Sequence, residues 1–157
     1  MRKFLTALVV VTLLATTILC VACGFEGTAF EALSQMKDKG TIDMEYTGVA
    51  GTGVFLTKVS YDGFTMANND DTYQYICLYI NSTNEDNLMI DEFMGPGEYD
   101  GETYNPSVAI DKIVYEKGMK LLVVYTEYDA ASGRYVPAKG DALLFTLPNK
   151  VEKVTLD

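Results

Sequence analysis

The chain has 157 residues and a net charge of −10, and it contains no histidine and no tryptophan. Without histidine, Ser-His-Asp and Cys-His catalysis and histidine-containing zinc sites are excluded. An acidic surface repels nucleic acid and anionic lipid headgroups, so we expect neither as a partner. The length suits one domain with a hydrophobic core.

An apolar segment opens the chain. Arg2 and Lys3 precede an apolar run over residues 4–21, which Ala22 and Cys23 follow. A basic start, an apolar stretch and a small residue at the end are the parts of a secretory signal. With a cysteine next, the segment resembles bacterial lipoprotein signal peptides. That resemblance implies cleavage after Ala22, acyl chains on Cys23, and anchoring on the extracytoplasmic face of a cell membrane.

Two alternatives stay open for this segment. Cys20 stands where such signals usually have leucine, three residues before the lipidated cysteine, and it is an alternative acceptor. Residues 4–22 also approach the roughly 20 residues that span a bilayer, so the signal could instead be retained as an anchor. With cleavage at Cys23, residues 23–27 form a short tether and residues 28–157 one β-rich domain.

Residues 28–39 are predicted to form a short helix. Thr28 and Glu31 match a capping box, and Gly40 can end the helix. The apolar positions recur at helical spacing: Phe30, Leu33 and Met36.

From Thr41 the apolar positions alternate, which predicts strands. Ile42, Met44 and Tyr46 would share one face of the first strand, a glycine-rich stretch over residues 48–53 would connect it to the next, and residues 54–60 would form the second. The oxygen-rich residues after them favour a solvated turn, with weak calcium-binding potential as the alternative: Asn68, Asn69, Asp70 and Asp71.

Residues 72–81 give the strongest strand pattern. Tyr73, Tyr75, Cys77 and Tyr79 alternate with apolar residues, which predicts an interior strand covered on both sides. Because Cys77 would be the only cysteine left in the domain, we expect a buried free thiol that packs as a small apolar side chain.

Residues 84–106 are acidic and rich in turn residues, and they are predicted to form a long loop. Long loops in compact domains often carry function. On composition alone this segment is the best candidate binding region. The candidate binding residues are Asp91, Glu92, Glu98, Tyr99, Asp100 and Tyr104.

The remainder of the chain also predicts strands. Residues 107–128 resemble a hairpin, residues 129–133 a turn, and residues 141–147 and 151–156 the final strands. The expected fold is mainly β: an antiparallel β-sandwich or open barrel of seven or eight strands with one short N-terminal helix.

Two family resemblances bear on this domain. The segment from Tyr104 to Leu156 resembles the C-terminal domain of PrcB-like bacterial lipoproteins, which are named for a protease complex. Residues 53–107, with the sequence YICLYINSTNED and a D-G-x-x-Y turn, look like the Ig-like domains of small surface lipoproteins. Both resemblances imply binding or assembly modules, and neither family supplies catalytic residues to carry over.

We therefore expect a membrane-anchored extracytoplasmic lipoprotein that acts as a non-catalytic protein- or ligand-binding module, without a cofactor. Its partners would be the membrane, through lipid on Cys23, and an envelope protein or a small ligand. A calcium-responsive envelope module is the alternative function, and a histidine-independent hydrolase is a further one.

Overall fold

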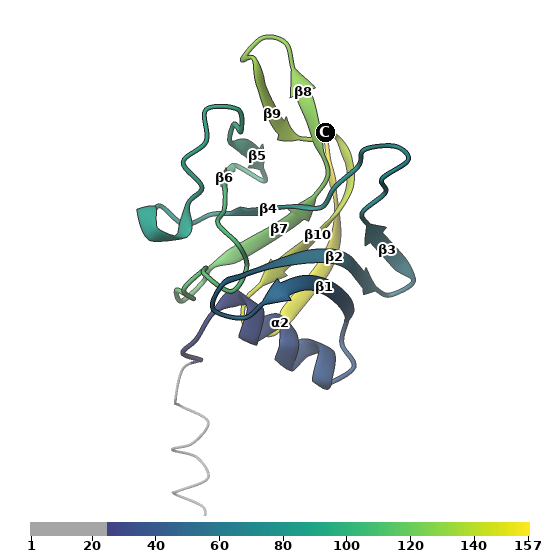
Figure 1. Ribbon diagram of the computed structural model, residues 1–157, viewed down its shortest axis with the longest axis vertical. Helices are drawn as coiled ribbons and strands as arrows, with labels where there is room; N and C mark the ends of the chain where they lie inside the picture. The colour runs from purple at the N-terminus through teal and green to yellow at the C-terminus, as the bar shows by residue number, and fades with distance from the viewer. Residues whose placement is uncertain (1–24) are drawn as a thin grey trace, which may run out of the picture.

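The computed structural model describes residues 25–157, so the signal segment, Cys20 and the lipidation candidate Cys23 lie outside the described residues. These residues form antiparallel sheets and one short N-terminal helix, which confirms the mainly-β fold (Figure 1). The elements in chain order are α2 (Ala29–Asp38), β1 (Asp43–Val49), β2 (Gly53–Tyr61), β3 (Phe64–Ala67), β4 (Cys77–Ile80), the 3-10 helix η1 (Glu85–Asn87), β5 (Gly97–Tyr99), β6 (Glu102–Pro106), β7 (Lys120–Val124), β8 (Thr126–Asp129), β9 (Arg134–Pro137), β10 (Gly140–Thr146) and β11 (Lys150–Leu156). Eleven strands exceed the expected seven or eight, because several contain only three to five residues.

Helix α2 begins at the predicted capping box. The Glu31 N–H donates to the Thr28 hydroxyl at 3.3 Å, and the Thr28 N–H donates to the Glu31 carboxylate at 2.8 Å. Gly40 follows the helix at φ +71°, in the left-handed region that glycine adopts readily. The chain before the helix also packs on the domain, because the Gly27 carbonyl accepts a hydrogen bond from the Tyr115 N–H.

Strands β1, β2 and β3 form a three-stranded sheet in that order. The two predicted strands and their glycine-rich connection are confirmed as β1 and β2, whereas β3 was not predicted. Of the three residues expected to share one face, Ile42 and Met44 are buried, whereas Tyr46 is half exposed. The Tyr46 ring still lies on the helix side, because it makes an edge contact with Phe30 of α2 at 5.0 Å between ring centroids. The register of the β1–β2 pairing shifts between Glu45 and Tyr46, where β2 contains one extra residue.

The second sheet has six strands in the order β11-β10-β7-β4-β6-β5 and curls into a half-barrel. Successive residues of its central strands point to opposite faces, as in Leu121 and Leu122 of β7. One face packs with α2 and the three-stranded sheet in the main core. The other face has its own smaller core, which includes Tyr79 and Tyr104.

The predicted strand over residues 72–81 begins only at Cys77. The Asn69 side chain accepts hydrogen bonds from the Asp71 and Thr72 N–H groups, and the Asn68 side chain accepts one from the Ile76 N–H. These side chains compete with a strand ladder for backbone donors, so the preceding residues turn instead. Tyr73 is therefore exposed outside the sheet rather than on a strand face.

The predicted hairpin over residues 107–128 is also wrong in its first half. Residues 107–115 run irregularly between β2 and α2, with Ile110 and Ile113 fully buried. Strand β7 instead pairs with β4 and β10. Beyond Tyr125 the chain forms a separate hairpin, β8–β9, which closes through the predicted turn at residues 129–133. The predicted final strands are confirmed as β10 and β11.

Candidate docking pocket

An apolar pocket of about 200 Å³ opens where four separate segments meet. Strand β2 contributes Phe55 and Leu56, the chain at the start of β4 contributes Leu78 and the preceding Ile76, and the loop before β5 contributes Met89 and Met94. Residues 106–109 complete the wall. The pocket can therefore accept an apolar group of modest size.

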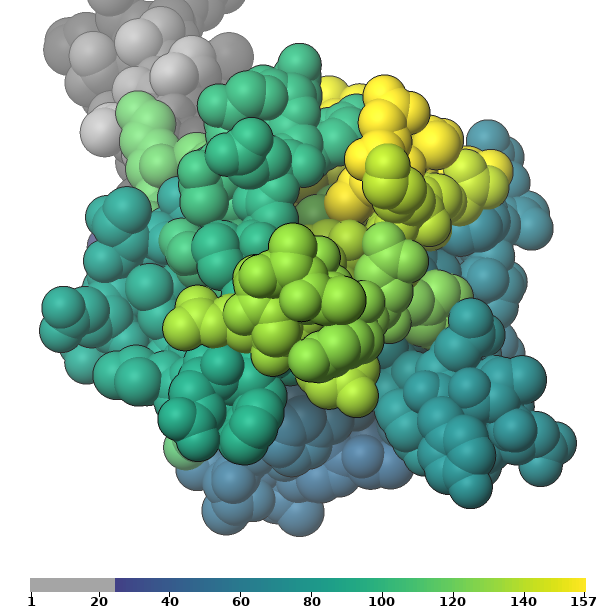
Figure 2. All heavy atoms as spheres, turned by 90° about the horizontal axis from the view of Figure 1, so that it is seen from above, coloured from purple at the N-terminus to yellow at the C-terminus, as the bar shows by residue number. Residues whose placement is uncertain are grey.

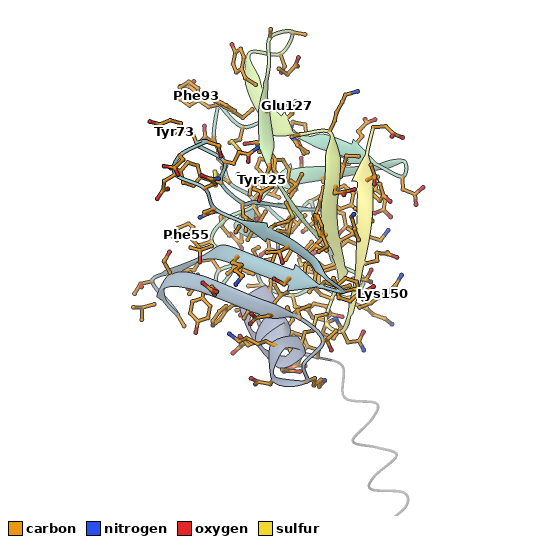
Figure 3. All side chains as sticks on the ribbon, turned by 90° about the vertical axis from the view of Figure 1, so that its right-hand side faces the viewer. Phe55, Tyr73, Phe93, Tyr125, Glu127 and Lys150 are labelled. Atoms are coloured by element: carbon orange, nitrogen blue, oxygen red, sulfur yellow. The ribbon has the colours of Figure 1, made fainter. Side chains whose placement is uncertain are left out.

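Four large apolar side chains that line this pocket, or lie within three residues of its lining residues in the sequence, face solvent. Ile90 is 94% exposed, Tyr73 82%, Phe93 62% and Phe55 58%. In Figure 3, Phe55, Tyr73 and Phe93 all project from one side of the molecule, whereas Lys150 lies on the opposite side. Exposed apolar side chains gathered around a pocket are typical of an interaction site, whereas single scattered ones are not. We call the pocket with Phe55, Tyr73, Ile90 and Phe93 the apolar face.

The loop that carries Ile90 and Phe93 is fastened at both ends. Its first part is held by the Met89 N–H, which donates to the Pro106 carbonyl at 2.9 Å. Its last part pairs with β9 through bonds from the Tyr135 N–H to the Phe93 carbonyl at 2.7 Å and from the Gly95 N–H to the Tyr135 carbonyl at 2.8 Å. Figure 2 shows the β8–β9 hairpin lying against the green segment that contains this loop. Residues 90–92 lie between these hydrogen bonds and are exposed to solvent.

Asp91 sets the local shape of the loop. Its carboxylate accepts a hydrogen bond from the Phe93 N–H at 2.7 Å, two residues further along. This side-chain turn is one that aspartate favours in loops. Asp91 therefore orients the backbone that presents Phe93.

A buried carboxylate holds the opposite wall. The Asp111 side chain accepts hydrogen bonds from the Val54 and Gly51 N–H groups, each at 2.7 Å. Burial alone would raise the pKa of Asp111, but the hydrogen bonds from the Val54 and Gly51 N–H groups, together with its own backbone N–H and the charge of Lys112, outweigh burial and hold the pKa below its usual value. The charged carboxylate thus joins residues 106–111 to the start of β2.

Cys77 lies in the pocket wall as a free thiol. Burial raises the pKa of this thiol, with a smaller opposing effect from the Thr126 hydroxyl. A thiol that stays protonated is a poor nucleophile. Cys77 therefore serves as an apolar lining residue, although it is half-buried rather than fully covered.

The candidate binding residues do not form one site. Asp91 and Glu92 are exposed on the loop of the apolar face, between Ile90 and Phe93. Glu98 instead borders a second hollow near the C-terminus, together with Glu127.

The other three candidates lie in or beside the β5–β6 hairpin. Asp100 occupies its turn at φ +51°, Tyr99 is half-buried against the smaller core, and Tyr104 is 1% exposed. Burial, with neighbouring Glu102, raises the pKa of Tyr104, whose hydroxyl donates to Glu102 at 3.1 Å. Tyr104 is thus a core residue and is not available to a partner at the surface.

Side chains of the oxygen-rich turn after β3 accept hydrogen bonds from nearby groups of the same segment. Asn68 and Asn69 accept backbone N–H groups, and Asp70 accepts the Tyr75 hydroxyl at 3.1 Å. Within residues 25–157, no group of three or more His, Cys, Asp or Glu side chains could hold a metal ion. The calcium alternative at Asn68, Asn69, Asp70 and Asp71 stays a prediction from the sequence.

The acidic composition of residues 84–106 did not identify Ile90 and Phe93 as candidate binding residues. The sequence signal was the pair of short apolar runs, LMI at residues 88–90 and FM at residues 93–94, that interrupt the acids. Phe55 could not be assigned to the site from the sequence, because it lies on a distant strand.

No family model, no curated protein and no solved structure matches this chain. The resemblances to PrcB-like and Ig-like lipoprotein domains therefore stay predictions from the sequence. In the part of the chain that the structure describes, no helix is long and apolar enough to cross a membrane.

Proposed function

We propose that this protein is a lipoprotein anchored through Cys23 on the extracytoplasmic face of a cell membrane, where it binds another protein through the apolar face. The observation that carries the proposal is the apolar pocket with exposed Ile90, Phe93 and Tyr73 around it. The function is non-catalytic binding.

The pocket volume favours a protein partner over a free small ligand. Sites for drug-sized ligands usually enclose roughly 300–1,000 Å³, whereas this pocket encloses about 200 Å³. One bulky side chain of a partner suits that space. Protein interfaces commonly place such an anchor in a central pocket and exclude water with surrounding contacts. The exposed side chains of the apolar face are suited to that surrounding role.

The position of the apolar face is compatible with a membrane anchor. The described chain starts beside α2, at the end of the domain away from the β8–β9 hairpin (Figure 1). Phe93 lies near that hairpin, because residues 93 and 95 bond to Tyr135 of β9. A lipid attached two residues before Phe25 would thus leave Phe93 directed away from the membrane.

Capture of partners from crosslinked cells tests this function. The full-length protein, the double variant Ile90→Ser/Phe93→Ser and the control Lys150→Ser are expressed in the native host and recovered after crosslinking. We expect the native protein and the control to retain a shared partner that the double variant loses. Because Ile90 and Phe93 are exposed, the double variant should keep the native thermal stability. Equal recovery with all three proteins would contradict the proposal.

A further inference from the structure

Most of the apolar face belongs to a part of the chain without cations. Residues 59–111 contain eleven acidic residues and no lysine, arginine or histidine. Apart from the two β2 residues, Phe55 and Leu56, every residue that lines the pocket comes from this segment. The surroundings of the pocket therefore combine apolar side chains with negative charge.

Several of these acids lie beside the exposed apolar side chains. Asp91 and Glu92 are exposed between Ile90 and Phe93. Asp70 is also exposed, and it contacts the hydroxyl of Tyr75 close to Ile76 in the pocket wall. None of the ion pairs formed within residues 25–157 includes these three carboxylates. Their charges are thus available to a partner.

Two cations border the same region: Arg134, and Lys112, whose ammonium donates to the Gly51 carbonyl beside Asp111. Arg134 on β9 packs against Gly95, and it is exposed. It lies on the hairpin side of the loop, whereas Asp91 and Glu92 are on the loop itself. The net charge of the exposed side chains next to the pocket is therefore still negative.

From this charge distribution we infer that the segment bound in the pocket is cationic: a bulky apolar residue flanked by lysine or arginine, on an envelope protein. The inference rests on the proposed function and specifies its partner. Opposite charges around an interface raise the association rate and disfavour partners of like charge. An acidic segment would place its charges against Asp91 and Glu92, and an anionic lipid surface would meet the same repulsion.

Peptide pools test the charge of the occupant. Three pools share a central leucine or phenylalanine in otherwise mixed sequence, and the flanking residues are lysine, serine or glutamate. The full-length protein is held in nanodiscs of zwitterionic lipid with its methionine methyl groups labelled with ¹³C. Substitution of Met89 and Met94 by leucine, one at a time, assigns their NMR signals in the pocket wall.

We expect the lysine pool to shift the Met89 and Met94 signals at the lowest concentration and to lose affinity as salt rises. The variant Glu92→Gln should bind the lysine pool about two- to fivefold more weakly, since an exposed ion pair contributes modestly. Its binding of the serine pool should be unchanged. The matched control Glu26→Gln removes one exposed charge near α2 and should bind as the native protein does.

The peptide experiment distinguishes the cationic nature of the bound segment from the docking function of the pocket. Equal affinity for the lysine and serine pools, or tighter binding of the glutamate pool, would overturn the cationic occupant and leave the binding function standing. Failure of every pool to shift Met89 and Met94 would overturn both the cationic occupant and the docking function of the pocket.

Discussion

The Asp111 carboxylate lies 2.7 Å from the backbone nitrogen of Val54, although 57 residues separate them in the sequence. This bond and its companion to Gly51 join the irregular segment over residues 106–111 to the start of β2. Both of these parts contribute walls to the apolar pocket. The shape of the pocket therefore depends on one buried charge.

Removal of this carboxylate should destabilise the fold. In Asp111→Ala the buried Val54 N–H and the Gly51 N–H lose their acceptor, which we expect to lower the free energy of unfolding by roughly 2–4 kcal/mol. Urea denaturation measures the change. The exposed Asp71→Ala is the control and should stay within about 0.5 kcal/mol of the native protein. Equal stability of the two variants would show that Asp111 does not hold the wall.

The same carboxylate should contribute to acid sensitivity. Since the folded-state pKa of Asp111 is lowered, its contribution is fully present above the unfolded-state value of about 4 and is lost as pH falls through the folded-state pKa. Asp111→Asn should therefore lose less stability than the native protein when the pH is lowered from 6 to 2. Urea denaturation across this range provides the comparison, and parallel losses in both proteins would contradict the assignment.

Two buried tyrosines of the smaller core should respond oppositely to loss of the hydroxyl. The Tyr79 hydroxyl is buried without a hydrogen-bond partner among the described residues, whereas the Tyr104 hydroxyl donates to Glu102. We expect Tyr79→Phe to be neutral or to stabilise the protein by about 1 kcal/mol, and Tyr104→Phe to destabilise it by about 1 kcal/mol. Thermal and urea denaturation compare the pair. A larger loss in Tyr79→Phe would indicate a hydrogen-bond partner for that hydroxyl.

The Cys77 thiol should react slowly. Partial burial and a raised pKa lower both its access and its thiolate fraction. At pH 8, iodoacetamide should modify Cys77 at least about tenfold more slowly than a cysteine introduced by Ile90→Cys, which is fully accessible. Peptide-level mass spectrometry measures both rates within one protein. Equal rates would show that the pocket does not cover the thiol.

The local parts of the fold could be predicted from the sequence. The capping box of α2 uses residues only three positions apart, and the β10–β11 hairpin follows from two alternating segments around a proline turn. By contrast, residues 107–115 have a strand-like pattern, yet Asp111 bonds to residues 57 and 60 positions away. No neighbouring residue indicates that interaction, so the segment could not be recognised as irregular.

The candidate site was predictable only in part. The acidic character of residues 84–106 pointed to the loop that carries Asp91 and Glu92. That reasoning also included Tyr104, which β6 turns into the core. Alternation over such a short strand does not reveal which face is covered. The pocket itself requires four segments to meet, and their arrangement is a property of the tertiary structure.

The central claim is that the apolar face binds a partner protein, and site-specific photocrosslinking in living cells tests it most directly. A photoreactive phenylalanine analogue is placed at Ile90 or, as the control, at Lys150 on the opposite side (Figure 3). The account predicts a discrete crosslinked protein from position 90 and none from position 150. Absence of adducts from position 90, or the same adducts from both positions, would contradict it.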